Sequence, residues 1–541
     1  MKILLVLLQV LLLSGAGTAE EMDETEMEHF DCLASNPVPV NIASENRLHA
    51  CGLFSNYQIA SLREYIRTNG DILSATELGT VAGFTPELAA AMRPYLSFES
   101  YSRSTAPRSR RLRQGLTLRY AKGSPAGKYR IQYGDIAEFH LSSRDRTLAS
   151  LAVHGKRPWK IVAGNYNARL GQGLMLWSGF SMSGVPLSTA FCKNASGFSP
   201  SSSFTPSFTG IAADYCDGTL RGGAALNADG TAIASAGWMG RSASAGANFI
   251  HSKGLAGISS DATMNIGHCC LFAEAAFSGA PAGIAGIYWA PAYGASCSFL
   301  VRYFSPGYSA GHAGAVRTGS KVRDEAGASA AAQWKWLAAS FDWALHPERL
   351  ENRKNNYQQI KSVVDAQPSF NFLRWEFAAR LRWEEKMALS PSEDGAVQEW
   401  RHYLRTGMKV SRKGFSTAAR VDYAVAGSLP HKGWLGSIEA GYKTPSSNPS
   451  ALRLSVFLRA TSCSTSAWAS RIYMYERDIP GSFSVRAWYG NSCGAALVCG
   501  LACRKWKYRH SLDLAAAFRK SDSGTGKGRH TELKIQYGLS L

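Results

Sequence analysis

The sequence predicts a mainly β protein, a large antiparallel transmembrane β-barrel preceded by a small all-α segment. Apolar and polar residues alternate along many short stretches after residue 113, which is the period of a β-strand. Charged residues make up only 18% of the chain, too few to cover the outside of a large soluble β protein. After residue 19, the longest apolar run, at 494–503, is about half of the roughly 20 residues that a transmembrane helix needs.

Residues 1–19 have the pattern of a secretory signal peptide. A positive residue, Lys2, precedes the apolar run 3–13, and small residues follow before Glu20. No cysteine follows the small residues, so a lipid anchor is not expected. The pattern therefore predicts export of the mature chain.

Charge is divided unevenly along the chain. Residues 20–31 hold seven acidic residues and no basic one, so 20–37 is predicted to be a disordered acidic tail. Residues 20–100 carry a formal charge of −9, whereas 101–541 carries +27. A basic lumen in the long part would favour anionic solutes. A basic linker is predicted at 99–113, with the arginines Arg103, Arg108, Arg110, Arg111 and Arg113.

Residues 38–98 are predicted to form two similar units, each a helix, a tight turn at a glycine and a second helix. Asn69 and Gly70 are a typical helix end. The expected apolar faces are Leu48, Leu53, Ile59, Leu62 and Ile66 in the first unit, and Leu78, Val81, Phe84, Leu88 and Met92 in the second.

These units resemble the tandem helix-hairpin-helix domain of the competence DNA-receptor family. Val40-Asn41-Ile42 matches the start of the family pattern, and 67–70 approximates its helix end. The hairpin turns fall at Gly52, Leu53 and Phe54 and at Gly83, Phe84 and Thr85. The resemblance implies that backbone N–H groups at each turn bind a DNA phosphate.

Two features of this copy favour a protein partner over DNA. Phe54 and Thr85 stand where the family has a second glycine, which lets the backbone approach a phosphate closely. Residues 40–98 hold four basic and five acidic residues, so little counterion would be released on binding DNA. We therefore expect this domain to dock a periplasmic protein. DNA uptake through the domain and the arginine linker is the alternative, with nucleic acid as the less favoured partner.

Residues 114–541 are predicted to form the barrel, with about 16–20 strands, a size that outer-membrane barrels allow. Alternation is clear at 128–134, 373–384, 482–490 and 533–541. In 373–384 the residues expected to face lipid are Trp375, Phe377, Leu381 and Trp383, and those expected to face the lumen are Arg374, Glu376, Arg380 and Arg382. The alternative is a soluble β-sandwich or barrel, whose strands also alternate.

A second resemblance extends over most of the chain. The stretches GNYNARLGQGLMLWSGF, 164–180, and RYFSPGYSAGHAGAV, 302–316, are similar to a family of Gram-negative outer-membrane β-barrel proteins with a periplasmic helix-hairpin-helix domain. The resemblance implies an outer-membrane location, with contact with lipid, and the barrel fold, but no established activity. The leading interpretation of the whole chain is a channel or assembly scaffold. Residues 171–180 would either fold into the lumen or form a strand end and turn with Trp177 at the interface. The second interpretation is slightly favoured.

The sequence predicts no enzyme, metal site or cofactor. The only catalytic pattern is G-x-S-x-G at 307–311, and a Gly-rich stretch rather than a helix follows it. No zinc-type cysteine spacing, P-loop or Rossmann pattern occurs. The 11 cysteines are interpreted mainly as small apolar residues in strands, with Cys32 and Cys51 as one candidate disulfide.

Overall fold

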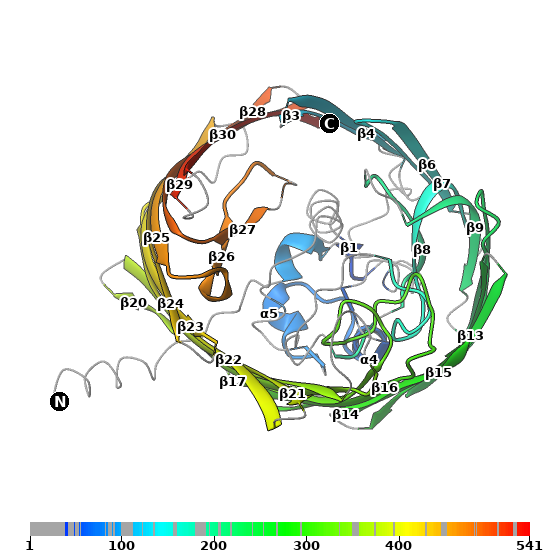
Figure 1. Ribbon diagram of the computed structural model, residues 1–541. Coiled ribbons are helices and arrows are strands. Elements are labelled where there is room, and N and C mark those ends of the chain that lie inside the picture. Colours follow the sequence, from blue (N-terminus) through cyan, green and yellow to red (C-terminus); the bar gives the residue numbers. More distant parts are fainter. Residues whose placement is uncertain are drawn as a thin grey trace.

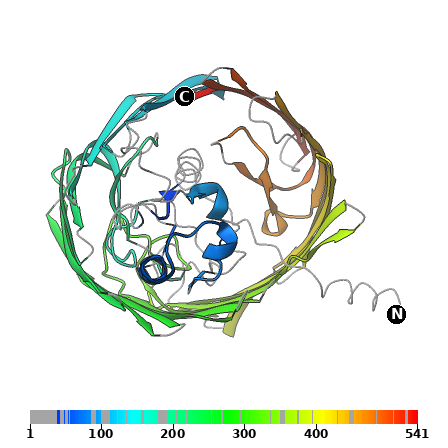
Figure 2. The ribbon, with the colours of Figure 1, turned by 180° about the vertical axis from the view of Figure 1, so that it is seen from behind.

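A closed ring of antiparallel strands surrounds several inner segments (Figure 1). The ring is seen from behind in Figure 2. The computed structural model describes residues 38–41, 48, 53–54, 56–81, 83–84, 89, 92–98 and 112–540, apart from 122, 134–135, 155–158, 179–190, 194, 204–206, 217–218, 241, 253, 267–268, 293–294, 335, 349–355, 373–374, 393–394, 428–429, 445–451, 481, 483, 506–507 and 523–526.

In the described part of the chain, 24 long strands form the wall, and each pairs with the next along the sequence. The first and last close the ring, from the pair Gly115 and Ser540 to the pair Ala121 and Lys534. The wall strands are β3 (Leu112–Ala121), β4 (Ser124–Tyr133), β5 (Ala137–Ser143), β6 (Thr147–His154), β7 (Trp159–Arg169), β9 (Phe208–Cys216), β10 (Leu220–Asn227), β11 (Ala232–Met239), β12 (Ala243–Ser252), β13 (Leu255–Ile266), β14 (Cys269–Ser278), β15 (Ala280–Ala292), β16 (Ala295–Phe304), β17 (Glu325–Trp334), β18 (Leu337–His346), β19 (Tyr357–Ala366), β21 (Trp375–Ser392), β22 (Gly395–Arg412), β23 (Phe415–Ala426), β24 (His431–Lys443), β25 (Arg453–Thr465), β28 (Asn491–Lys505), β29 (Tyr508–Asp522) and β30 (Lys527–Ser540).

Two short strands lengthen the wall locally. β8 (Gly197–Pro200) pairs with the end of β7, and β9 pairs with the rest of that strand. β20 (Ser369–Phe372) pairs with the start of β21, and β19 pairs with the stretch that follows. Each short strand therefore continues the line of a longer one rather than adding a position to the ring.

The wall is larger than the expected 16–20 strands. Several strands are rich in Ala, Gly and Ser, such as β17 with the sequence EAGASAAAQW. Alternation between such small residues has little hydrophobic contrast, so the period of two is hard to detect. The wall also begins at Leu112, two residues before the expected boundary, so Arg113 belongs to a strand.

The outward face of the wall exposes large apolar side chains. Ile211, Leu226, Ile438 and Leu458 are each more than half exposed, although they lie on paired strands. Tryptophans on the same surface include Trp159, Trp238, Trp289, Trp334 and Trp434. In water so much exposed apolar surface would promote association, whereas lipid satisfies it.

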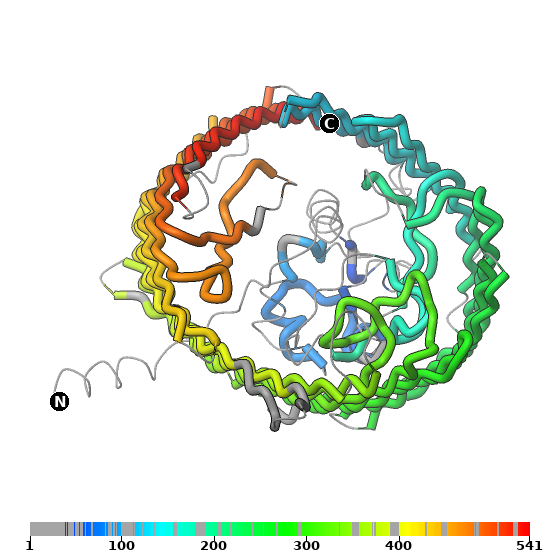
Figure 3. The backbone as a smooth tube through the Cα atoms, in the orientation of Figure 1, coloured from blue at the N-terminus to red at the C-terminus, as the bar shows by residue number. Residues whose placement is uncertain are grey.

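Three inner segments connect wall strands and lie within the ring (Figure 3). The first inner segment is the described part of 170–207 apart from β8, which pairs with the wall, and the second is 305–324, between β16 and β17. The inner hairpin, 466–490, joins β25 to β28 and contains η4 (Trp468–Ser470), β26 (Ile472–Glu476) and β27 (Ser484–Trp488).

One expectation about these segments was wrong and another was right in part. The alternating stretch 482–490 forms the second strand of the inner hairpin, not a wall strand, and Trp488 on it is buried. The described part of 171–180 turns back on the end of β7 through a bridge between Arg169 and Trp177, as the favoured interpretation expects, but it is buried inside the ring, and Trp177 donates its N–H to His312 of the second inner segment. Alternation in the sequence cannot distinguish a strand of an inner hairpin from a wall strand, because each has one apolar and one polar face.

The described part of 38–98 has a separate core. Its elements are β1 (Val38–Pro39), α4 (Asn56–Asn69), α5 (Ala75–Leu78), η1 (Arg93–Tyr95) and β2 (Leu96–Ser97), with β1 and β2 pairing in parallel. α4 ends as expected at Gly70, whose φ of +87° suits glycine. α4 and the single-turn α5 are the α-helices of this segment whose bounds the structure gives. Leu48, Ala89 and Met92 are helical as well, and the tandem arrangement is not shown.

The core of this segment contains most of the expected apolar residues. The buried ones are Leu48, Ile59, Leu62, Leu78, Val81, Phe84 and Met92, with Leu53 and Ile66 packed against them. Among the described residues, no helix has the length and apolar character needed to cross a membrane. Residues 1–37 and 99–111, which include the signal peptide, the acidic tail and most of the arginine linker, lie outside the described residues.

Candidate functional site in the barrel lumen

Arginine side chains of the wall hold the inner hairpin. The guanidinium groups of Arg405 and Arg420 donate to the Tyr473 carbonyl oxygen at 3.4 and 3.3 Å. Arg459 donates to the Tyr475 carbonyl oxygen at 3.0 Å. Two similar bonds run from Arg401 to Arg471 and from Arg119 to Pro480. The hairpin backbone therefore meets a row of inward-pointing cations from the wall.

The same wall arginines are also paired with carboxylates. Asp422, which is fully buried, lies 2.9 Å from Arg405 and 2.6 Å from Arg420. Glu439 lies 2.5 Å from Arg459. Each of the three guanidinium groups is thus shared between a wall carboxylate and a hairpin carbonyl. This sharing fixes the arginines in place and stabilises the hairpin against the wall.

On β21 the structure places the expected residues on two faces. Arg380 lies 2.6 Å from the Asp365 carboxylate, and Arg382 lies 3.1 Å from Glu384. Leu381, which lies between the two arginines in the sequence, is 48% exposed, and Trp383, which follows Arg382, is 39% exposed. Both lie on the outward face of the strand.

The remaining residues of this strand are less informative. Trp375 and Glu376 are both exposed, at the beginning of β21, and Phe377 is half-buried. Arg374 lies outside the described residues. The described arginines therefore meet the Asp365 carboxylate of β19 and the Glu384 carboxylate of β21 itself, and they do not form a free cationic row.

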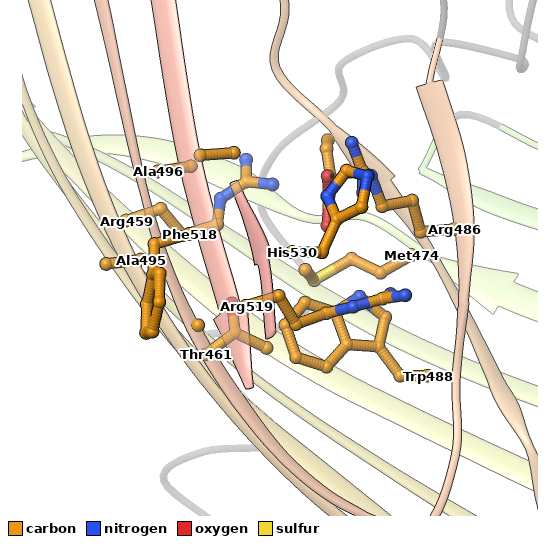
Figure 4. Close-up of a pocket in the computed structure, with 13 residues that line it drawn as sticks. Arg459, Thr461, Met474, Arg486, Trp488, Ala495, Ala496, Phe518, Arg519 and His530 are labelled. Atoms are coloured by element: carbon orange, nitrogen blue, oxygen red, sulfur yellow. Dashed lines mark ion pairs between the residues drawn. The ribbon is translucent and has the colours of Figure 1, made fainter. Parts of the chain in front are cut away.

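A small pocket lies between the inner hairpin and the wall (Figure 4). Met474, Glu476, Arg486 and Trp488 line it from the hairpin. The wall contributes Arg459, Thr461, Gly494, Ala495, Ala496, Ala517, Phe518, Arg519 and His530. The lining thus has three arginines and one histidine but a single carboxylate.

Arg519 is the cation of this pocket that is available to a ligand. Arg486 is paired with Glu476 at 2.7 Å, and Arg459 is engaged as described above. Arg519 forms no ion pair within the described part of the chain, and its guanidinium lies 5.4 Å from the Trp488 ring centre. His530 lies at the same pocket and is exposed. An arginine beside an aromatic face suits a carboxylate or phosphate carried on a flat apolar group.

The first inner segment is anchored by one wall carboxylate. The backbone N–H groups of Gln172 and Leu174 donate to Glu274 Oε2 on β14 at 2.8 and 2.9 Å. Gly171 makes this approach possible, because a Cβ at this position would lie 2.7 Å from Glu274 Oε1 and because its φ is +59°. The glycine at 171 is therefore explained by contact with the wall.

The second inner segment packs on the first. The Tyr308 hydroxyl donates to the Leu174 carbonyl oxygen at 2.9 Å. The Gly314 N–H donates to the Gly173 carbonyl oxygen at 2.9 Å. Burial raises the pKa of Tyr308 well above its usual range, so the hydroxyl stays protonated as a donor. The two segments form one apolar cluster with the adjacent wall.

A buried ionic group ties the second inner segment to the wall. Arg302 on β16 lies 2.5 Å from Glu325 and 2.8 Å from Asp342, and all three side chains are buried. Glu325 also accepts from the N–H groups of Thr318 and Gly319 at 2.9 Å each. Because buried charges are tolerated only when paired and hydrogen-bonded, this group holds the segment in one arrangement.

Sequence reasoning missed Glu274, Arg302 and Tyr308. A signal exists for Glu274, because it is the only charged residue of β14 and shares a face with Phe272 and Ala276. No comparable signal marks Arg302, because its partners come from β17 and β18. Ion pairs between strands depend on register, which a single sequence does not reveal.

The predicted hairpin turns are placed only in part. Gly52 and Thr85 lie outside the described residues. Gly83 has a φ of +85°, and its carbonyl oxygen accepts from the Gln58 side chain at 2.8 Å. Phe54 and Phe84 are buried, with ring centres 5.9 Å apart, and Leu53 packs against the same core. The Phe54 ring therefore points into the core rather than over the turn.

The G-x-S-x-G pattern lies in the second inner segment. Ser309 is exposed, its N–H donates to the Ser278 carbonyl oxygen at 3.0 Å, and an irregular stretch without a helix follows. This local structure lacks the strand-turn-helix arrangement that makes the serine of the pattern a nucleophile. The segment joins β16 and β17, which are paired neighbours in the wall.

Comparisons with known proteins find similarity only among solved structures. No protein-family model matches the chain, and no curated protein matches it significantly. OccK7 (OpdD) of Pseudomonas aeruginosa is 11% identical, with 80% of this chain and 98% of that chain covered and a TM-score of 0.30. OmpT of Vibrio cholerae with loop L8 deleted, an outer membrane protein, is 9% identical, with 57% and 98% covered and a TM-score of 0.27. Such values carry no argument about this chain's activity.

Proposed function

We propose that this chain is an outer-membrane β-barrel channel that favours small anionic solutes. The observation that carries the membrane location is the outward face, where large apolar side chains such as Ile211 and Leu458 are more than half exposed on a closed sheet. A closed barrel leaves no backbone edge unpaired, which is the condition for residing in lipid.

The preference for anions rests on the inner surface. Residues 101–541 carry a formal charge of +27, and arginines of β22, β23 and β25 point toward the inner hairpin. Most of these cations are compensated by carboxylates, so the available charge is concentrated at few places. Arg519, beside Trp488, is the clearest of them. An anion entering the lumen would meet this guanidinium without displacing an existing ion pair.

The test is ion selectivity in planar bilayers. The reversal potential of the purified full-length protein in a salt gradient should show anion preference, and Arg519→Gln should weaken it. Lys520→Gln is the matched control, because Lys520 follows Arg519 on β29 and lies on the opposite face with Phe518, which is exposed. Cation preference, or the absence of conductance, would contradict the proposal.

We further propose that residues 38–98 form a periplasmic docking domain for a protein partner. The separate apolar core supports an independent unit, and the contact between Phe54 and Phe84 brings the two turn regions together within it. Affinity capture through residues 20–113 tests this proposal, with the same piece carrying Phe54→Ala as control. Capture of the same proteins by both pieces would contradict a role for the folded domain.

A further inference from the structure

Two cysteines distant in sequence face each other in the barrel. Cys192 belongs to the first inner segment, and Cys270 belongs to wall strand β14. Their Sγ atoms are 3.9 Å apart, although the residues are 78 positions apart in the chain. The contact therefore joins an inner segment to the wall.

The faces of β14 explain why Cys270 and not Cys269 makes this contact. Residues 272 and 274, Phe and Glu, are buried on the face that holds the first inner segment. Cys270 shares this face, because alternate residues of a strand point to the same side. Cys269 lies on the opposite face, so the two adjacent cysteines differ in which surface they meet.

Cys192 is held in position by its neighbour. The Lys193 N–H donates to Gln172 Oε1 at 2.8 Å, and Gln172 Nε2 donates to the Lys193 carbonyl oxygen at 3.2 Å. Gln172 is itself bound to Glu274 through its backbone N–H at 2.8 Å. Cys192 and Cys270 are thus connected through Lys193, Gln172 and Glu274, which restrains the position of both thiols.

We propose that Cys192 and Cys270 form a disulfide that fastens the first inner segment to the barrel wall. The bond requires the sulfur atoms to approach by roughly 2 Å, because an S–S bond is about 2.05 Å long, and rotation of the two side chains can supply this movement. The inference rests on the outer-membrane location for its oxidising compartment, since the periplasm favours disulfides.

The reaction is a thiol–disulfide exchange with an oxidising disulfide as co-reactant. The thiolate of one cysteine attacks the external disulfide and forms a mixed disulfide, which releases one thiol. The second cysteine then attacks the mixed disulfide and releases the other thiol. The two cysteines lose two electrons and two protons, and the external disulfide is reduced to two thiols.

The first experiment identifies the bond in the full-length protein. Protein in outer-membrane fractions is incubated with oxidised glutathione, its free thiols are blocked with N-ethylmaleimide, and it is digested without reductant. Mass spectrometry should find one linked peptide pair containing Cys192 and Cys270, two hydrogen masses below the sum of the thiol peptides. Reduction before blocking should abolish this pair.

Matched variants decide whether the geometry is responsible. Cys270→Ser should lose the linked pair and leave Cys192 alkylated, whereas Cys269→Ser should retain the pair. Alkylation of both Cys192 and Cys270 in the oxidised unaltered protein would overturn the proposal. If Cys192 is linked to Cys269 in the Cys270→Ser protein in the same amount as it is linked to Cys270 in the unaltered protein, the proposal is overturned as well.

A second measurement tests the mechanical consequence. Amide hydrogen exchange at 172–174 should be slower in the oxidised than in the reduced protein, because the bond ties this stretch to β14. In Cys270→Ser the difference between the two conditions should vanish. Equal exchange in both states of the unaltered protein would overturn the claim that the disulfide fastens the segment. These outcomes do not depend on ion selectivity, so they are separable from the test of the channel.

Discussion

Leu381 and Arg382 are adjacent in the sequence but meet opposite environments. Leu381 is exposed on the outward face of β21, and Arg382 points to the carboxylates of Asp365 and Glu384. A strand in a barrel wall therefore assigns each residue to lipid or lumen by parity alone. The same parity separates Cys269 from Cys270 on β14.

This parity predicts different effects of substitutions at the two positions. Leu381→Arg should destabilise the assembled barrel by about 2–4 kcal/mol, because an arginine would face lipid near mid-strand. Arg382→Ala should have a mild effect, since it removes two ion pairs of a partly exposed side chain. Urea unfolding of the two variants in lipid vesicles, followed by the loss of heat-modifiable mobility on gels, checks the difference. Equal stability of the two proteins would contradict the orientation of β21.

At the scale of elements, the first and second inner segments are linked to the wall at a small number of backbone positions. Glu274 accepts from two N–H groups of the first segment, and Glu325 accepts from two of the second. Each anchor is a wall carboxylate that receives backbone donors. Such a carboxylate supplies the hydrogen bonds that an irregular buried chain lacks.

A methyl group at Gly171 should disturb one anchor. Gly171→Ala would bring Cβ to 2.7 Å from Glu274 Oε1 at a φ of +59°, so we expect destabilisation of the first inner segment by about 1–3 kcal/mol. Gly311→Ala is the control, because its Cβ would meet no atom within 4 Å. Hydrogen exchange at 172–174 should rise in the first variant only. Unchanged exchange in Gly171→Ala would contradict the role of the glycine.

The domain at 38–98 allows a test of the alternative function, DNA uptake. We expect this piece to bind duplex DNA weakly, because residues 40–98 contain four basic and five acidic residues and therefore carry no net positive charge. The longer piece 38–113 adds the five linker arginines and should bind more tightly at low salt only. Fluorescence anisotropy at several salt concentrations compares the two pieces. Tight, salt-resistant binding by the shorter piece would make DNA uptake the leading function.

The sequence predicted elements better than their placement. Strands β4 and β30 follow from the alternation at 128–134 and 533–541, because large apolar and polar residues there differ strongly. The inner hairpin has the same alternation, and only the pairing of β25 with β28 shows that it leaves the wall. The candidate site was largely unpredictable, since Arg519 becomes distinctive only when the carboxylates near its neighbours are known.

At the scale of the whole molecule, charge is spread over the barrel as well as concentrated at Arg519. Distributed charge acts over about 10 Å at 0.1 M salt and about 3 Å at 1 M. The excess of +27 on 101–541 should therefore favour anions mainly at low salt. Reversal potentials measured at constant salt ratio should show anion preference that declines as the mean concentration rises. Anion selectivity that does not change with salt concentration would mean that local sites such as Arg519, and not the distributed charge, produce the selectivity.

The pairing of the first and last wall strands has a consequence for the order of events during biogenesis. Arg119 on β3 and Gln536 on β30 are hydrogen-bonded at 2.9 Å across 417 positions of sequence. The ring cannot close until β30 is available, because β30 pairs with the edge of β3 that β4 does not cover. Until then both β3 and the most recently added strand present unpaired backbone groups, which are templates for misassembly. The two edges therefore stay open together and are covered in a single step, when β30 pairs with β3.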